Sequence, residues 1–256
     1  MNNSTLSPII KICGLTSLEQ ALSCVELGAD WLGLNCWSGS SRYITAEKAL
    51  EIVDGLPESV STVGVFVNES TDTLESIMRE TGIDLAQLHG DETPESCKKI
   101  TVPWFKAFRV SPDFQPQRIQ DYGGETFLLD AYSKTHYGGS GQKIDWELAS
   151  TVSAMGKLIL AGGLAPENVA DAVNKVRPWG VDVSSGVEST PGEKSPDLIR
   201  AFCAAARSRG AGPAGRTARR GRPGAGPLPL HRTSPGPGWC RTGRHAAGHG
   251  DIRRRQ

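Results

Sequence analysis

Several short apolar runs of the sequence end in residues that could transfer protons. Cys13 and Gly14 follow the run Ile9 to Ile12, and Asp130 follows the run Thr126 to Leu129. A thiol and a carboxyl group can each exchange a proton with a substrate, the thiol only when part of it is ionised. Taken alone, a cysteine is usually inert packing and an aspartate after a strand is often a turn former. These two residues therefore need further context before they indicate a site.

Glycine and serine follow two other apolar runs. Gly162 and Gly163 come after one of them, and Ser184, Ser185 and Gly186 come after the next. Glycines let backbone N–H groups approach an anion, and the N-terminus of a following helix adds a favourable dipole. Either segment alone could be an ordinary turn. Together, on neighbouring strands, they predict a phosphate site.

The apolar runs are short and rich in β-branched residues, which is typical of buried strands. We expect eight such strands: Ile9 to Ile12, Trp31 to Leu34, Thr62 to Val67, Leu85 to Leu88, Trp104 to Phe108, Thr126 to Leu129, Leu158 to Leu160 and Val181 to Val183.

Amphipathic segments with recognisable caps separate these strands. Ser17 and Gln20 form a capping-box pattern at the start of one expected helix. Thr45 can cap the next helix, and Gly55 ends it. Pro166 occupies the place of a first-turn proline in a later helix.

Strand and helix alternate about every 20 to 30 residues, which predicts parallel strands joined by right-handed crossovers. Eight such units in about 200 residues predict a single α/β domain over residues 1–208, a (β/α)8 TIM barrel rather than an open doubly wound sheet. Neither G-x-G-x-x-G nor G-x-x-x-x-G-K-[ST] follows any expected strand, which disfavours the open-sheet nucleotide binder. In a barrel the active face lies at the strand C-termini, and phosphate often binds after strands seven and eight.

The C-terminal segment 209–256 differs in composition from the rest of the chain. Residues 1–208 hold 17 Lys and Arg against 27 Asp and Glu, a net charge of −10, whereas residues 209–256 hold 11 Arg against Asp251 alone, a net charge of +10. The basic Gly/Pro/Arg-rich tail cannot bury enough apolar surface to fold, so we expect it to be disordered. GC-rich DNA read in a wrong frame also yields Arg, Gly, Pro and Ala, so the tail is alternatively expected to be a frameshift product. A tail that binds RNA is the alternative, but Trp239 is its only aromatic residue.

The six cysteines contain no C-x-x-C pair, so neither a zinc site nor a secreted disulfide framework is indicated. No apolar run approaches the length of about 18 residues that a membrane span needs. The N-terminus lacks a charged segment followed by a long apolar one. We therefore expect a cytoplasmic protein with no membrane partner.

Five segments resemble the signature segments of the phosphoribosylanthranilate isomerase family of tryptophan biosynthesis. They are KICGLT at 11–16, QLHGDE at 87–92, LLDA followed by GGSGQKIDW within 128–146, LAGGLAPENV at 160–169 and DVSSGVE at 182–188. The similarity runs in order from about residue 8 to 207. It implies an Amadori rearrangement of N-(5-phosphoribosyl)anthranilate to the 1-deoxyribulose 5-phosphate derivative, without a cofactor or a metal. The implied partner is this phosphorylated small molecule, with nucleic acid disfavoured and a monomer or a homodimer left open.

The resemblance also implies roles for individual residues. Cys13 matches the general base of the family and Asp130 its general acid, on strands one and six. Strand alternation places Lys11 on the same side as Cys13, one layer deeper, and we hypothesise that it helps to hold the thiolate. Arg42 matches the position that pairs with the anthranilate carboxylate, and Asp182 one that contacts the sugar hydroxyls. Gly162, Gly163, Ser184, Ser185 and Gly186 remain the expected phosphate site.

Other interpretations of the same residues stay open. His89 could titrate, although a histidine after a strand more often satisfies backbone partners, and Arg109 has no assigned role. A non-catalytic phosphate-binding barrel with an RNA-contacting tail is the alternative function. The related sugar-phosphate isomerase of histidine biosynthesis is a further possibility, but it is expected to carry aspartate in place of Cys13.

Overall fold

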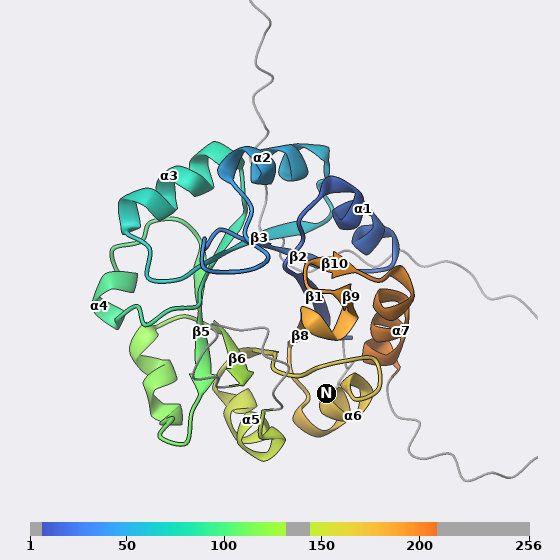
Figure 1. The fold of residues 1–256 in the computed structure, drawn as a ribbon. Coiled ribbons are helices and arrows are strands. Elements are labelled where there is room, and N and C mark those ends of the chain that lie inside the picture. The colour runs from blue at the N-terminus through green and yellow to red at the C-terminus, as the bar shows by residue number, and fades with distance from the viewer. Residues whose placement is uncertain (1–6, 132–143, 209–256) are drawn as a thin grey trace, which may run out of the picture. The chain divides into compact units, whose positions relative to one another are not determined.

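Eight parallel strands close into a barrel in the computed structural model, which describes residues 7–131 and 144–208. Each strand pairs with the next along the chain, and β1 pairs with β8 to close the sheet (Figure 1). The predicted fold class is therefore confirmed. The barrel strands are β1 (Ile9–Cys13), β2 (Trp31–Asn35), β3 (Ser61–Phe66), β4 (Leu85–Leu88), β5 (Trp104–Val110), β6 (Thr126–Ala131), β7 (Lys157–Leu160) and β8 (Gly180–Val183).

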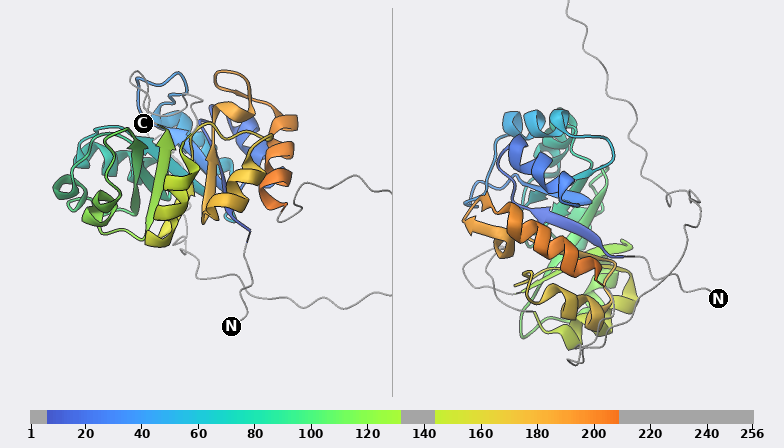
Figure 2. Two further views of the ribbon diagram at one scale, coloured as in Figure 1. Left: turned by 90° about the horizontal axis from the view of Figure 1, so that it is seen from below. Right: turned by 90° about the vertical axis from the view of Figure 1, so that its right-hand side faces the viewer.

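Helices lie outside the strands, as the side views show (Figure 2). Apolar side chains on the outer faces of the strands pack against them, and a second apolar cluster that includes Val63, Phe105 and Leu128 forms separately. The helices are α1 (Leu18–Glu26), α2 (Ala46–Gly55), α3 (Thr71–Thr81), α4 (Pro94–Cys97), α5 (Trp146–Val152), α6 (Val169–Val176) and α7 (Pro196–Arg207), with 3₁₀ turns η1 (Pro116–Tyr122), η2 (Ser153–Met155) and η3 (Ser185–Val187).

Two predicted caps are present and one predicted helix start is wrong. The Ser17 hydroxyl accepts from the Gln20 N–H, and the Thr45 hydroxyl accepts from the Lys48 N–H. In a full capping box the Gln20 side chain would also accept from the Ser17 backbone N–H. Here its amide group donates to the Thr16 hydroxyl and to the Gly192 carbonyl instead. Pro166 lies in a turn before α6 rather than in its first turn.

That turn before α6 is held by the Asn168 side chain. Its carbonyl oxygen accepts from the Ala165 N–H, and its amide donates to the Gly163 carbonyl. These local bonds replace a first helical turn, so α6 begins only at Val169.

Several strands extend further than predicted, and two of them therefore include a candidate proton-transfer residue. Cys13 is the last residue of β1, and Asp130 belongs to β6 rather than following it. Residues inside a strand have their side-chain direction set by the pleat. The positions of both groups therefore depend on the rigid barrel rather than on loops.

A small hairpin was not predicted. β9 (Glu188–Thr190) and β10 (Glu193–Lys194) pair antiparallel between β8 and α7, beside β1 in Figure 1. Thr16 donates to the Gly192 carbonyl near the turn of this hairpin, which attaches it to the loop after β1.

The predictions for the tail 209–256 and for GGSGQK within 132–143 concern residues outside the described part of the chain. Within residues 7–131 and 144–208, no helix is both long and apolar enough to cross a membrane.

Candidate active site

One cavity at the C-terminal ends of the strands is lined by every residue that the sequence nominated for the site. These are Cys13, Arg42, Asp130, Gly162, Gly163, Asp182, Ser184, Ser185 and Gly186. They lie at or just after the first, the last and some intervening strands of the barrel, and the closure of β8 onto β1 brings them together.

Glycines make room for the Cys13 thiol and for Arg42. A Cβ added to Gly33 on the neighbouring strand would lie 2.6 Å from the Cys13 Sγ atom. Gly14 has a φ of 79°, and a Cβ there would collide with the Arg42 side chain. A residue without a side chain is therefore needed behind Cys13 both for the turn and for the arginine.

Lys11 and Asp182 form a buried ion pair beneath the cavity. The Lys11 Nζ atom lies 2.9 Å from Asp182 Oδ1, and the two residues are register partners of β1 and β8. Burial disfavours the charged ammonium, yet the attraction of Asp182 and of the Cys13 thiolate outweighs it and raises the pKa of Lys11. Lys11 is therefore a stable positive charge at the barrel floor.

The Cys13 thiol is harder to ionise than a free thiol. Burial raises its pKa, Lys11 acts in the opposite direction, and the negative charge of Asp182 raises the pKa again. Lys11 does lower the pKa of Cys13, as hypothesised, but the effect of burial on that pKa is larger. A substrate that brings positive charge beside the thiol would have to complete the ionisation.

Asp130 faces the cavity from β6, and each of its carboxylate oxygens has one neighbour. Its Oδ1 atom accepts from the Ala131 N–H at 2.8 Å, and its Oδ2 atom lies 3.4 Å from His89 Nε2. A Cβ on Gly162 would lie 2.7 Å from the Ala131 nitrogen, so this glycine allows the loop after β7 to pack against the end of β6 beside Asp130. The His89 ring meets the side chains of Gln87 and Asp130, not the backbone partners that were expected.

Arg42 is held by a carboxylate that the sequence analysis missed. Its Nε and Nη2 atoms donate to Glu188 Oε1 and Oε2 at 2.7 and 2.6 Å, and the buried Lys194 Nζ lies 2.7 Å from Glu188 Oε1. Burial alone would raise the pKa of Glu188, but Arg42 and Lys194 together lower it. Two cations around one anion leave an excess positive charge at the cavity edge, which suits an anionic ligand.

The glycine and serine loops after β7 and β8 border the same cavity. Gly162 and Gly163 have φ values of 83° and 65°, and a Cβ on Gly186 would collide with the Leu164 carbonyl. The helix N-terminus that was expected directly after these loops is not found there. The helix α6 starts only at Val169, and the element after β8 is a three-residue 3₁₀ turn. An anion here would rely on backbone N–H groups and nearby cations.

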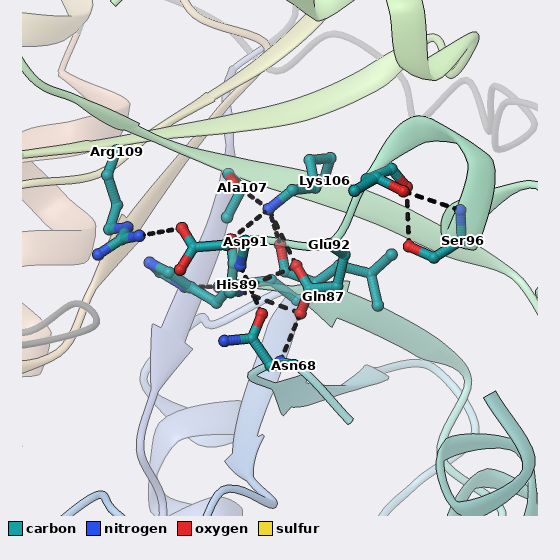
Figure 3. Close-up of polar contacts among 12 residues, drawn as sticks. Asn68, Gln87, His89, Asp91, Glu92, Ser96, Lys106, Ala107 and Arg109 are labelled. Atoms are coloured by element: carbon teal, nitrogen blue, oxygen red, sulfur yellow. Dashed lines mark hydrogen bonds and ion pairs between the residues drawn. The ribbon is translucent and has the colours of Figure 1, made fainter. Parts of the chain in front are cut away.

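A buried polar network fixes the loop after β4, which carries His89 (Figure 3). The Glu92 carboxylate accepts from the backbone N–H groups of Gly90 and Asn68 and pairs with Lys106 Nζ at 3.1 Å. At its exposed edge Asp91 pairs with Arg109. Arg109, which had no assigned role, is thus an ion-pair partner of this loop. The sequence around Arg109 on β5 gave no indication of its pairing with Asp91.

No group of three or more His, Cys, Asp or Glu side chains within the described ranges could hold a metal ion.

The comparisons with known proteins agree on one family. Residues 10–205 match the family model described as N-(5'phosphoribosyl)anthranilate (PRA) isomerase. The N-(5'-phosphoribosyl)anthranilate isomerase of Trichlorobacter lovleyi is 48% identical over 194 residues, which cover 75% of this chain and 95% of that protein.

Solved structures of the same name are also similar to this chain. The structure of monomers made from the dimeric Thermotoga maritima isomerase is 40% identical with a TM-score of 0.70, and the match covers 78% of this chain and 98% of that one. An isomerase in complex with reduced 1-(o-carboxyphenylamino)-1-deoxyribulose 5-phosphate has the same identity, TM-score and coverage.

Proposed function

The chain belongs to the N-(5'-phosphoribosyl)anthranilate isomerase family, and we propose that Cys13 and Asp130 carry out the proton transfers of its reaction. The enzyme converts N-(5-phosphoribosyl)anthranilate to 1-(2-carboxyphenylamino)-1-deoxyribulose 5-phosphate, the third step of tryptophan synthesis from chorismate. The observation that carries the assignment is that the two side chains line one cavity from β1 and β6.

The rearrangement needs an acid and a base in turn. Asp130 protonates the ring oxygen of the ribose, and the ring opens to an iminium at carbon 1. The Cys13 thiolate then takes the proton from carbon 2, which gives an enolamine that tautomerises to the ketone. The positive iminium favours both the loss of that proton and the ionised thiol beside it.

The substrate has two anionic ends, and the cavity offers groups for each of them. Arg42 contacts the anthranilate carboxylate through the N–H donors that Glu188 does not use. The planar guanidinium has donors along more than one edge, so it can bind two carboxylates at once. The phosphate lies against the backbone of Gly162, Gly163 and the 184–186 turn. Asp182 meets the sugar hydroxyls with the carboxylate edge left free by Lys11.

A fluorescence assay of phosphoribosylanthranilate tests these roles. We expect Cys13→Ser and Asp130→Asn each to lower kcat by about a hundredfold to ten-thousandfold, because each removes one proton-transfer group. Cys36→Ser is the matched control, since Cys36 is half-buried on the chain just after β2. Full turnover in either site variant would overturn the assignment.

The enzyme works in the cytoplasm, as a monomer or a homodimer, with no nucleic-acid partner. The described cysteines are free thiols, and a base such as Cys13 has to stay reduced, which a reducing compartment ensures. The Thermotoga maritima relative is named as dimeric. Sedimentation of the purified full chain, with and without added RNA, measures its assembly and tests the absence of an RNA complex.

A further inference from the structure

His89 is a buried titratable residue that the proposed proton transfers do not use. It is 4% exposed and Asp130 is 5% exposed. Within the described part of the chain, His89 Nε2 and Gln87 Oε1 are buried polar atoms without a hydrogen-bond partner at ordinary distance. His89 Nε2 lies 3.4 Å from Asp130 Oδ2. Catalytic hydrogen bonds are often this long before the substrate binds.

Gln87 determines what His89 can offer to Asp130. Its side-chain nitrogen lies 2.7 Å from His89 Nδ1. In this orientation the amide donates to Nδ1, so a neutral ring carries its proton on Nε2 and donates to an ionised Asp130. After a half-turn of the amide, Nδ1–H donates to the Gln87 oxygen, and Nε2 accepts from a protonated Asp130. In both arrangements Nε2 and Oδ2 share one proton.

We propose that His89 is a positioning residue that acts on the reaction through Asp130, by a hydrogen bond that shares one proton between Nε2 and Oδ2. The inference rests on the proposed role of Asp130 as the acid. His89 holds the reactive carboxyl edge in place and returns a proton to it after each turnover.

Proton balance gives the reason for such a residue. In one turnover Asp130 gives a proton to the ring oxygen, and Cys13 takes one from carbon 2. The tautomerisation of the enolamine moves one further proton from oxygen to carbon 1 with no net change. Before the next turnover Asp130 must regain one proton and Cys13 must release one to solvent. His89 is placed to hand on the proton that Asp130 regains. As the Nε2 proton passes to Asp130 Oδ2, Nδ1 takes a proton that comes from solvent and the Gln87 amide makes its half-turn, so the ring stays neutral.

The surroundings support a fixed ring. The backbone N–H of His89 donates to the Phe66 carbonyl at 2.8 Å, and the following residues are held by Glu92 (Figure 3).

The charged groups around the pair come from all the neighbouring strands. Arg109 on β5 is the register partner of Asp130 and is paired with Asp91. Cys13, Lys11 and Asp182 lie on β1 and β8. Lys11 and Arg109 each have a carboxylate partner, so among the described residues that surround the pair His89 is the group that remains to exchange a proton with Asp130.

A double-mutant cycle tests the proposal on the full chain. We expect His89→Gln to lower kcat by about tenfold to hundredfold, with KM changed by less than about threefold, because the substrate contacts remain. In an Asp130→Asn background the same change should cost no further activity, because the group through which His89 acts is already lost. Thr93→Ala, which removes the N-cap of α4, is the control nearby in sequence, and its effect should be the same in both backgrounds.

A nuclear magnetic resonance measurement covers the case in which His89→Gln does not fold. With ¹⁵N-labelled histidine in the unsubstituted chain, the Asp130→Asn change should shift the His89 ring nitrogen signals by several parts per million. Equal losses from His89→Gln in both backgrounds, or ring signals that Asp130→Asn leaves unchanged, would overturn the proposal. Undiminished turnover of Asp130→Asn itself would instead refute the acid assignment on which the inference depends.

Discussion

The Arg42 guanidinium is paired along one edge with the Glu188 carboxylate, so only its other edge is open to a ligand. We expect Arg42→Lys to raise KM by about tenfold or more with a smaller change in kcat, because an ammonium cannot bond Glu188 and a substrate carboxylate in the same planar way. Steady-state kinetics measures this, with Arg79→Lys on the outside of α3 as the control. A KM that stays within the control range would place the carboxylate elsewhere.

The ion pairs of Glu188 with Arg42 and Lys194 make the stability of the fold depend on pH in the acid range. The folded-state pKa of Glu188 is lowered, so its contribution to the free energy of unfolding is present above the ordinary glutamate pKa of about 4.3 and is lost as the pH falls through the folded value. Glu188→Gln should therefore flatten the loss of stability between about pH 5 and pH 3. Urea unfolding at a series of pH values measures the slope. An identical slope in both proteins would contradict the prediction.

The raised pKa of Cys13 predicts slow alkylation at neutral pH. The rate with iodoacetamide should keep rising above pH 9, because only the thiolate reacts. Asp182→Asn should speed the reaction and Lys11→Met should slow it, since the two charges act on the thiol in opposite directions. Peptide mass spectrometry separates Cys13 from Cys36, whose pKa burial raises to about 12. Rate changes of the same sign in both variants would reject this electrostatic account.

Gly162 and Gly82 have similar backbone angles but different neighbours, and they form a matched pair. Both have φ near 70–85°, so alanine is strained at either position. A Cβ on Gly162 would lie 2.7 Å from the Ala131 nitrogen, whereas one on Gly82 would lie 3.6 Å from the nearest atom, on Val53. We expect Gly162→Ala to lower kcat at least about tenfold through Asp130, and Gly82→Ala to lower only the melting temperature. Equal kinetic effects would contradict this.

A chain that ends at Ser208 should keep the kcat of the full chain. The family match ends at residue 205, and α7 ends at Arg207 after packing against α1 and α6. Every candidate site residue lies before that point. Kinetics and thermal unfolding of both lengths measure the effect, and a large loss of activity would show that residues 209–256 contribute to the site or its stability.

Local patterns predicted the strands because buried parallel strands are short apolar runs between caps. They also pointed to Cys13 and Asp130, which line the cavity, since both stand at the ends of such runs and within recognisable segments. The predicted bounds stopped too early at these two residues because a polar side chain at a strand end looks like the start of a loop. Pairing with the neighbouring strands extends each strand by at least one residue.

Glu188, Lys194 and Lys106 were missed for a different physical reason. Charged residues are usually exposed, and only a partner distant in sequence makes their burial tolerable. Arg42 and Glu188 are 146 positions apart, and Lys106 and Glu92 face each other only after β4 and β5 pair. His89 was noted, but its contact with Asp130 was not predicted, because nothing near His89 in the sequence indicates β6.

The ion pair between Lys11 and Asp182 joins residues that are 171 positions apart, one on the first strand and one on the last. During translation the residues below Cys13 have no counter-charge until β8 has emerged from the ribosome. A nascent polypeptide that lacks β8 therefore lacks both this ion pair and the 184–186 turn that lines the cavity.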